Sequence, residues 1–222
     1  MTELQVQAFE NLARNYRFDF ERRHSHKVAA LAASIFDQLQ IRNLLGHLHI
    51  PERRTLVAAC YAHAIGGHGQ VPGEASALLS DNRPVLAQSD RGLVSFETLR
   101  TLLKNPPAQL QREPLSAVDR SAFLYAILWH NASNTYVVDD EPLVDRFYAH
   151  ATAGILRLAD ALDSPLRPAV GDVRIVSSAD YLRLLLRTTD TLEDEIPSAQ
   201  ERSDILESVT GKRMVVQEIV DR

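Results

Sequence analysis

Two histidines and one aspartate lie at the ends of helical patterns, where they could act together on a metal ion. His24 is at one end of an apolar helix stripe, His63 is at the end of another, and Asp160 lies in the run LRLADALD. A helical bundle can bring such side chains to one point in its core. Two imidazoles and a carboxylate suit a divalent metal. A bound metal activates water and polarises a phosphoryl oxygen, as phosphate-ester hydrolysis requires.

The same residues also have an ordinary structural interpretation. A histidine on an apolar helix face is commonly a hydrogen-bonded core residue, so spacing alone leaves both interpretations open. Two further histidines are His68, just after HAIGG, and His130, in LWHNASN. His26 is two residues from His24, about 200° around a helix, and is expected to face solvent.

Helical periodicity predicts the elements that must position these side chains. Apolar residues recur at steps of three and four along most of the first 165 residues. Glycine and proline mark the breaks between these patterns. We expect helices over residues 3–14, from an Asp19 N-cap through Leu39, from Pro51 to His63, near 74–79, from Ser95 to Leu103, over 116–130 and from Pro142 to Leu162.

The composition changes after residue 165. Val170–Val176 and Tyr181–Arg187 are rich in β-branched residues or leucine and flank SSAD, which predicts a hairpin. A helix over 198–209 and a strand over 212–220 follow. The fold class is mainly α, with a helical domain over 1–165. A small α+β subdomain of three short antiparallel strands covers 166–222 and packs on it, and Pro165–Pro168 form the joint.

Composition excludes several classes of protein. The 222 residues carry a net charge of −5, which disfavours a nucleic-acid partner, and 24% charged residues, which is ordinary for a folded domain. The single cysteine allows no internal disulfide and no cysteine-based zinc site. We find no signal-peptide pattern and no apolar run near 20 residues. These features predict a cytoplasmic protein with no membrane partner.

The order of these motifs resembles the HD phosphohydrolase superfamily, whose pattern is a His, a His-Asp pair closing a helix, and a late Asp. His24, HAIG at 63–66 and LRLADALD at 156–163 follow that order. RRHSHKVAALAASIFDQL, LVAACYAHAIG, the strand pair and ESVTGKRMVV resemble the C-terminal HD domain of the exopolyphosphatase/guanosine pentaphosphate phosphohydrolase family. The resemblance extends from about Phe9 onward. It implies an HD-type bundle, a metal held by His24, His63 and Asp160, and a phosphohydrolase function.

One position departs from the superfamily pattern. Ala64 stands where the His-Asp pair has its aspartate, so the set loses a hard carboxylate oxygen. Mg²⁺ and Mn²⁺ prefer oxygen ligands and would be held poorly, whereas Zn²⁺ and Fe²⁺ accept imidazole. We keep Zn²⁺, Fe²⁺ and Mn²⁺ as candidate cofactors. His68 or His130 would complete the shell or serve as the catalytic acid or base.

Basic residues near His24 suggest an anionic ligand. Arg23 and Lys27 share a helix face next to the His24 stripe, and guanidinium and ammonium groups bind phosphate. An ordinary solvated face is the alternative. We expect a domain that binds a phosphorylated nucleotide of the guanosine tetra- or pentaphosphate type, or polyphosphate, with weakened or lost metal-dependent hydrolysis. The alternative is a non-catalytic regulatory or homodimerisation module on the same scaffold.

Overall fold

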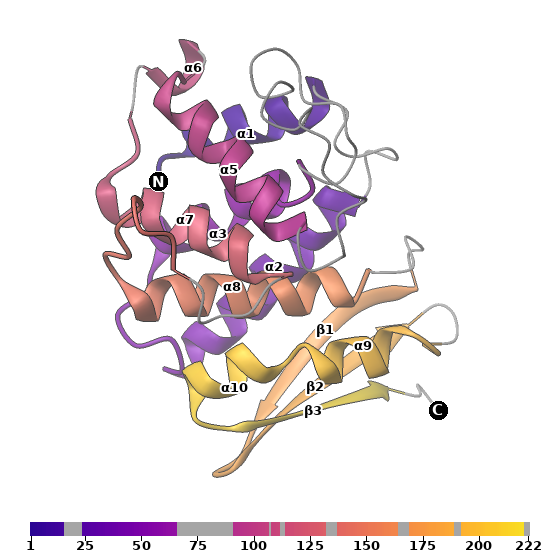
Figure 1. Ribbon diagram of the computed structural model, residues 1–222. Helices are drawn as coiled ribbons and strands as arrows, with labels where there is room; N and C mark the ends of the chain where they lie inside the picture. The colour runs from indigo at the N-terminus through magenta and orange to yellow at the C-terminus, as the bar shows by residue number, and fades with distance from the viewer. Residues whose placement is uncertain are drawn as a thin grey trace.

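A computed structural model of the chain describes residues 1–15, 24–65, 91–106, 108–111, 114–131, 137–163, 169–188 and 192–219. Helices make up most of it, and a small sheet follows them, as Figure 1 shows. The mainly helical fold class with a small C-terminal sheet is therefore confirmed. The elements are α1 (Glu3–Asn15), α2 (His24–Ile41), α3 (Ile50–Ala62), α5 (Arg91–Lys104), α6 (Ala108–Gln111), α7 (Ala117–Trp129), α8 (Arg146–Ala161), β1 (Val170–Ser177), β2 (Tyr181–Thr188), α9 (Glu195–Glu201), α10 (Asp204–Thr210) and β3 (Arg213–Ile219).

Helix α7 runs through the centre of the bundle. Every residue from Ser121 to Trp129 is buried, because α3, α5 and α8 pack around this helix. A helix that is apolar on all sides needs such a surround. The approach of α5 is close at Gly92, where an added Cβ would lie 2.5 Å from the carbonyl oxygen of Leu128. A larger residue at position 92 would force the two helices apart.

Helices α2 and α3 form an antiparallel pair that positions two of the candidate ligands. The apolar stripes predicted for both helices are buried, including Leu31 on α2 and Leu56 on α3. Arg53 donates two hydrogen bonds to the carboxylate of Asp37, at 2.7 and 2.9 Å, and so ties the helices together. Because the pair is antiparallel, the first residue of α2 lies beside the last turn of α3.

Some helix boundaries differ from the sequence prediction. Helix α5 begins at Arg91, four residues before the predicted cap at Ser95, whose hydroxyl donates instead to the carbonyl of His63. Helix α8 begins at Arg146 because Asp145, rather than the segment at Pro142, accepts the first-turn bond from Tyr148 N. The predicted helix over 198–209 is two short helices, α9 and α10. The expected Asp19 cap, the helical piece near 74–79 and the joint at 165–168 lie outside the described residues.

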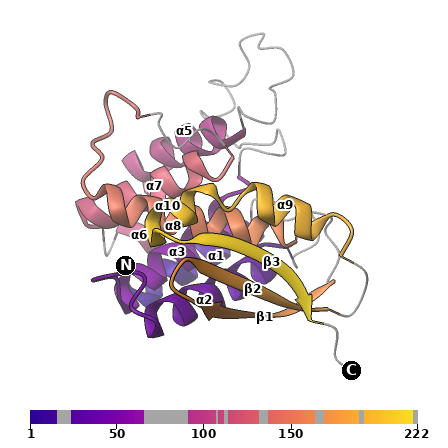
Figure 2. The ribbon, with the colours of Figure 1, turned by 90° about the horizontal axis from the view of Figure 1, so that it is seen from below.

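The sheet has the predicted strands but a different orientation for the last one. Strand β1 pairs with β2 in the antiparallel direction, and β3 pairs with β2 in the parallel direction. The prediction of three antiparallel strands is therefore wrong for β3. The connection between β2 and β3 includes α9 and α10, which return the chain to the starting end of β2, as a parallel crossover requires. Figure 2 shows α9 running alongside β3.

Each edge of the sheet is covered by a glutamine side chain. On the β1 edge, Gln38 of α2 donates to the carbonyl of Val173 at 2.6 Å and accepts from Ile175 N at 2.7 Å. On the β3 edge, Gln200 of α9 donates to the carbonyl of Met214 at 2.9 Å, and its oxygen accepts from Val216 N at 3.1 Å. Each amide thus takes the place of a neighbouring strand, and these edge groups are not available to another chain.

Replacing Gln38 by alanine should lower the free energy of unfolding by about 2 kcal/mol, because a carbonyl and an N–H of β1 would lose their partner. Urea unfolding monitored by circular dichroism would measure this change. Gln217→Ala, at an exposed position on β3, is the matched control and should shift stability by less than about 0.5 kcal/mol. Equal effects of the two substitutions would contradict the assigned role of Gln38.

Among the described helices, none is both long enough and apolar enough to cross a membrane.

Candidate metal centre

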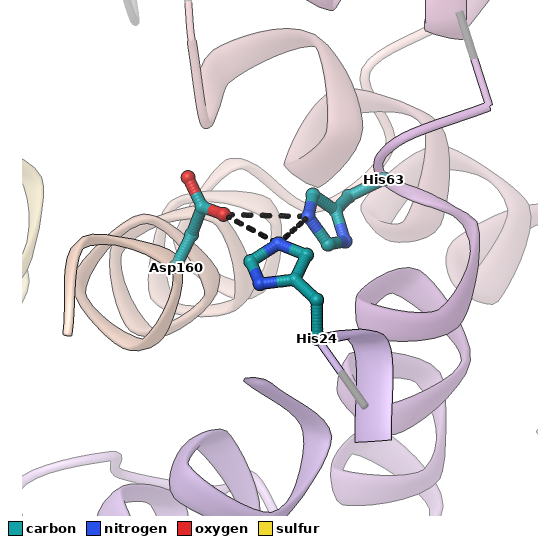
Figure 3. Close-up of side chains that lie close together, drawn as sticks. All are labelled: His24, His63 and Asp160. Carbon is teal, nitrogen blue, oxygen red and sulfur yellow. Dashed lines mark hydrogen bonds and ion pairs between the residues drawn. The ribbon is translucent and has the colours of Figure 1, made fainter. Parts of the chain in front are cut away.

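Three helices bring His24, His63 and Asp160 together, as predicted. His24 is the first residue of α2, His63 follows the last residue of α3, and Asp160 lies in the last turn of α8. Figure 3 shows their side chains converging on one point. The Nε2 atoms of the two histidines are 3.2 Å apart, and each lies 3.3 Å from Asp160 Oδ1. These three atoms form a nearly equilateral triangle.

Both imidazoles are held so that Nε2 faces this triangle. His63 Nδ1 lies 2.7 Å from the carbonyl oxygen of Cys60, to which it can only donate. His24 Nδ1 lies 2.9 Å from Oδ2 of Asp163, a carboxylate acceptor. An imidazole whose Nδ1 donates to a carbonyl or carboxylate is fixed in orientation, and in its neutral form Nε2 carries the free lone pair. This is the arrangement that metal-binding histidines adopt.

Asp160 presents one oxygen to the histidines and the other to Arg202. Its Oδ2 accepts a hydrogen bond from a guanidinium nitrogen of Arg202 at 2.9 Å. Burial opposes ionisation of this carboxyl, but its interactions with His24 and His63 hold the pKa of Asp160 well below its ordinary value. Asp160 is therefore an ionised carboxylate that directs a single oxygen, Oδ1, at the two histidines.

In the metal-free protein His24 holds a proton. Burial acts to lower the pKa of His24, but its hydrogen bonds to Asp160 and Asp163 outweigh burial and raise that pKa to about 9. The second proton of the imidazolium is on Nε2, within reach of His63 Nε2 and Asp160 Oδ1. This proton lies between the three atoms, and a metal ion that bound there would replace it.

The triangle has the dimensions of a metal centre. His24, His63 and Asp160 are a group that could hold a metal ion. Three ligands of a tetrahedral ion with bonds of about 2.0 Å lie about 3.3 Å from one another. The observed separations of 3.2, 3.3 and 3.3 Å match this spacing. Two nitrogens and one oxygen suit Zn²⁺ or Fe²⁺ better than Mg²⁺, and three ligands leave a position for water or substrate.

His130 lies beside this centre but does not offer a free nitrogen to it. Its ring packs edge-on against the ring of His63, with centroids 5.3 Å apart. Its Nδ1 donates to the carbonyl of Ile127 at 2.5 Å, and its Nε2 accepts from the amide of Asn131 at 2.7 Å. Burial, together with the electrostatic influence of His63, lowers the pKa of His130 to about 3, so the ring is neutral. The predicted acid–base role of His130 stays a prediction.

The other predicted site residues fall in two groups. His68 and Arg23 lie outside the described residues, so their predicted roles stay predictions. Lys27 is described, and its ammonium donates to the carbonyl of Val170 at the start of β1. That contact ties α2 to the sheet. His26 is exposed near Glu10 and Tyr61, which confirms that it faces away from the site.

Sequence patterns missed one contributor to the site. Arg202 follows α9, 42 positions after Asp160, and no periodicity links the two residues. Asp163 had a detectable signal, since it lies one helical turn beyond Asp160 in the run ADALD. Cys60 contributes only its carbonyl. Burial raises the pKa of its thiol well above the ordinary value, so it is not a thiolate ligand.

No protein-family model matches the chain, and no curated protein matches it.

Proposed function

We propose that the chain is an HD-like domain whose His24, His63 and Asp160 bind one Zn²⁺ or Fe²⁺ ion. The observation that supports this proposal best is the triangle of two Nε2 atoms and one carboxylate oxygen at 3.2–3.3 Å. In this proposal the metal, when bound, lowers the pKa of a water and withdraws charge from a phosphoryl oxygen. The ligand in this proposal is a phosphorylated nucleotide of the guanosine tetra- or pentaphosphate type, or polyphosphate. The order of the sequence motifs, which resembles that of the HD superfamily, supports this choice.

In this proposal the chain's own residues orient the ligands and set their charge. Asp163 and the Cys60 carbonyl fix the two imidazoles, and Arg202 fixes the carboxylate. The neutral His130 fills the space next to His63 without adding charge. The set supplies one negative charge from Asp160, so a divalent ion keeps a net positive charge that attracts a phosphate group.

Two measurements test this proposal, first the metal content of the protein and then its release of phosphate. The purified protein, first stripped with chelator and then reconstituted, should bind about one equivalent of Zn²⁺ or Fe²⁺. The reconstituted protein should then bind guanosine tetraphosphate, guanosine pentaphosphate or polyphosphate and release phosphate slowly. Binding of less than one-tenth equivalent of any divalent metal after reconstitution would rule out the metal centre.

A second candidate is a non-catalytic regulatory module on the same scaffold. Two observations favour it: Ala64 supplies no carboxylate, and both ring nitrogens of His130 are already engaged. The metal-binding aspartate of the resembled His-Asp pair and a free acid or base are then both missing from the described part of the site. This candidate predicts ligand binding with no release of phosphate from any of the three substrates.

Ala64→Asp distinguishes the two candidates. The substitution adds a hard oxygen donor next to His63, and we expect it to raise affinity for Mn²⁺ by about 10-fold or more. Under the regulatory candidate the variant gains metal affinity but still releases no phosphate, because both ring nitrogens of His130 remain engaged. Under the enzymatic candidate the natural sequence already turns over. The matched control is Ala64→Asn, which places a side chain of the same size and no negative charge at the same half-buried position. Equal Mn²⁺ affinity in the Asp and Asn variants would contradict the role assigned to position 64.

A further inference from the structure

One face of α8 contacts residues 202–206, which run from the end of α9 into the first turn of α10. Positions 154, 157 and 160 recur every three residues along α8, so they lie on one face of the helix. Their partners run in the opposite direction along the chain. The three contacts are Gly154 with Leu206, Arg157 with Asp204, and Asp160 with Arg202. We call this row of contacts the α8 seam. It ends at a candidate metal ligand.

Gly154 sets how closely the C-terminal segment approaches. A Cβ on Gly154 would lie 3.0 Å from Leu206 N and 3.2 Å from Leu206 Cα. Backbone atoms cannot move aside as a flexible side chain can, so alanine at this position would push α10 away from α8. One turn further, Arg157 Nε lies 3.4 Å from a carboxylate oxygen of Asp204. The close packing at Gly154 therefore fixes the distance at which Arg202 reaches Asp160.

Arg202 decides how Asp160 can bind a metal. A carboxylate can bind a metal ion through one oxygen or through both. Arg202 holds Oδ2 at 2.9 Å, and Oδ1 alone faces His24 and His63 at 3.3 Å. The Arg202 side chain is mostly buried, with 21% of its surface exposed, so this charged hydrogen bond is poorly screened by water. With Oδ2 occupied, Asp160 provides one oxygen only.

We propose that Arg202 is a positioning residue that makes Asp160 a one-oxygen ligand, and that the C-terminal subdomain thereby sets the affinity and coordination number of the metal centre. This proposal rests on the metal centre proposed above. It assigns the subdomain a part in the site and not only in packing. Partners that orient a ligand typically contribute 10- to 100-fold in metal affinity.

Metal titrations on the full chain test this role. Arg202→Met keeps the apolar stem and removes the guanidinium, and we expect its Zn²⁺ affinity to fall by about 10- to 100-fold. Arg202→Lys should recover part of that loss, since an ammonium can still bind Oδ2. Arg213→Met, at an exposed position on β3, is the matched control and should bind Zn²⁺ as the natural sequence does. Gly154→Ala keeps the guanidinium but displaces it, so it should lower affinity as well.

Co²⁺ absorption gives a readout that simple destabilisation would not change. The natural sequence with Co²⁺ should show the intense visible bands of a four-coordinate ion. In Arg202→Met, Asp160 is free to bind through both oxygens, and the bands should weaken as the coordination number rises. If Arg202→Met does not fold, Arg202→Gln, which keeps an amide donor in the seam, serves for the same two measurements.

The outcomes separate this proposal from the one on which it rests. If the natural sequence binds Zn²⁺ and Arg202→Met binds it equally well with an unchanged Co²⁺ spectrum, the positioning role is wrong and the metal centre stands. A lower melting temperature of the metal-free variant, with affinity and spectrum unchanged, likewise shows a purely structural residue. If the natural sequence itself binds no metal, the proposed metal centre fails, and this inference fails with it.

Discussion

Replacing His63 by alanine is expected to abolish tight binding of Zn²⁺. His63 Nε2 is one of the three proposed ligand atoms, and its Nδ1 is already committed to the Cys60 carbonyl, so no other atom of the residue can substitute. Structural zinc sites with four ligands bind with roughly 10–16 kcal/mol, or about 3 kcal/mol for each ligand. Loss of one ligand should therefore weaken binding by about 100-fold or more. Isothermal titration with Zn²⁺, or competition with a chelator of known affinity, would measure this loss.

His26→Ala is the matched control for that experiment. His26 is on the same helix as His24, and its exposed ring lies near Glu10 and Tyr61 rather than the triangle. Its removal should leave Zn²⁺ affinity unchanged. Because His63 is buried, the His63→Ala variant must also be shown to fold, and His24→Ala, at a more accessible ligand, should give a comparable loss. Unchanged affinity in both folded ligand variants would refute the assignment of the site.

The candidate ligands could be predicted because each lies on a regular helix. On α2 and α3, buried apolar residues recur every three to four positions, and His24 and His63 continue those stripes at their ends. Such a pattern shows which face of a helix is buried but not which helices meet. The prediction that His24, His63 and Asp160 share one site came from their positions at helix ends and from the order of the motifs. The α2–α3 pair, tied by Arg53 and Asp37, is the contact that brings the two histidines together.

The surroundings of the ligands could not be predicted, because they depend on long-range packing. Arg202 reaches Asp160 beside the place where α10 packs on Gly154, and a single glycine in a helical pattern gives no indication of its neighbour. The two engaged nitrogens of His130 likewise depend on the end of α7. The parallel direction of β3 was missed for a related reason: strand patterns give alternation, and direction is set by the path of α9 and α10.

The metal-free protein is expected to be most stable near pH 6.5. His24 has a folded pKa of about 9 against 6.5 when unfolded, so its contribution is complete below pH 6.5 and is lost as pH rises through 9. The shift corresponds to about 3 kcal/mol. The pKa shift of His130 has the opposite direction and opposes folding in acid. Its folded pKa of about 3 means that folding excludes a proton, which costs about 2 kcal/mol by pH 5.

Urea unfolding with chelator present, at intervals from pH 5 to 9, would give the free energy of unfolding against pH. The curve should have an alkaline limb, where stability falls above pH 6.5, and an acid limb, where it falls below pH 6.5. His24→Asn should flatten the alkaline limb, and His130→Asn should flatten the acid limb, while His26→Ala should leave both in place. The two site variants will also be less stable overall, so the comparison is of slopes and not of absolute free energies. A stability that rises steadily from pH 6.5 to 9 would contradict the contacts assigned to His24.

Bound metal should reverse the alkaline limb. A histidine must give up its Nε2 proton to bind a metal, so metal affinity increases as pH rises toward the pKa of His24. A ligand that binds only the folded state stabilises it in proportion to the logarithm of its concentration over its dissociation constant. With saturating Zn²⁺, the free energy of unfolding should therefore hold or rise between pH 6.5 and 9, where the metal-free protein loses stability. The metal replaces the same Nε2 proton whose loss weakens the metal-free protein. The difference between the two curves therefore measures how strongly proton and metal compete for the triangle of His24, His63 and Asp160.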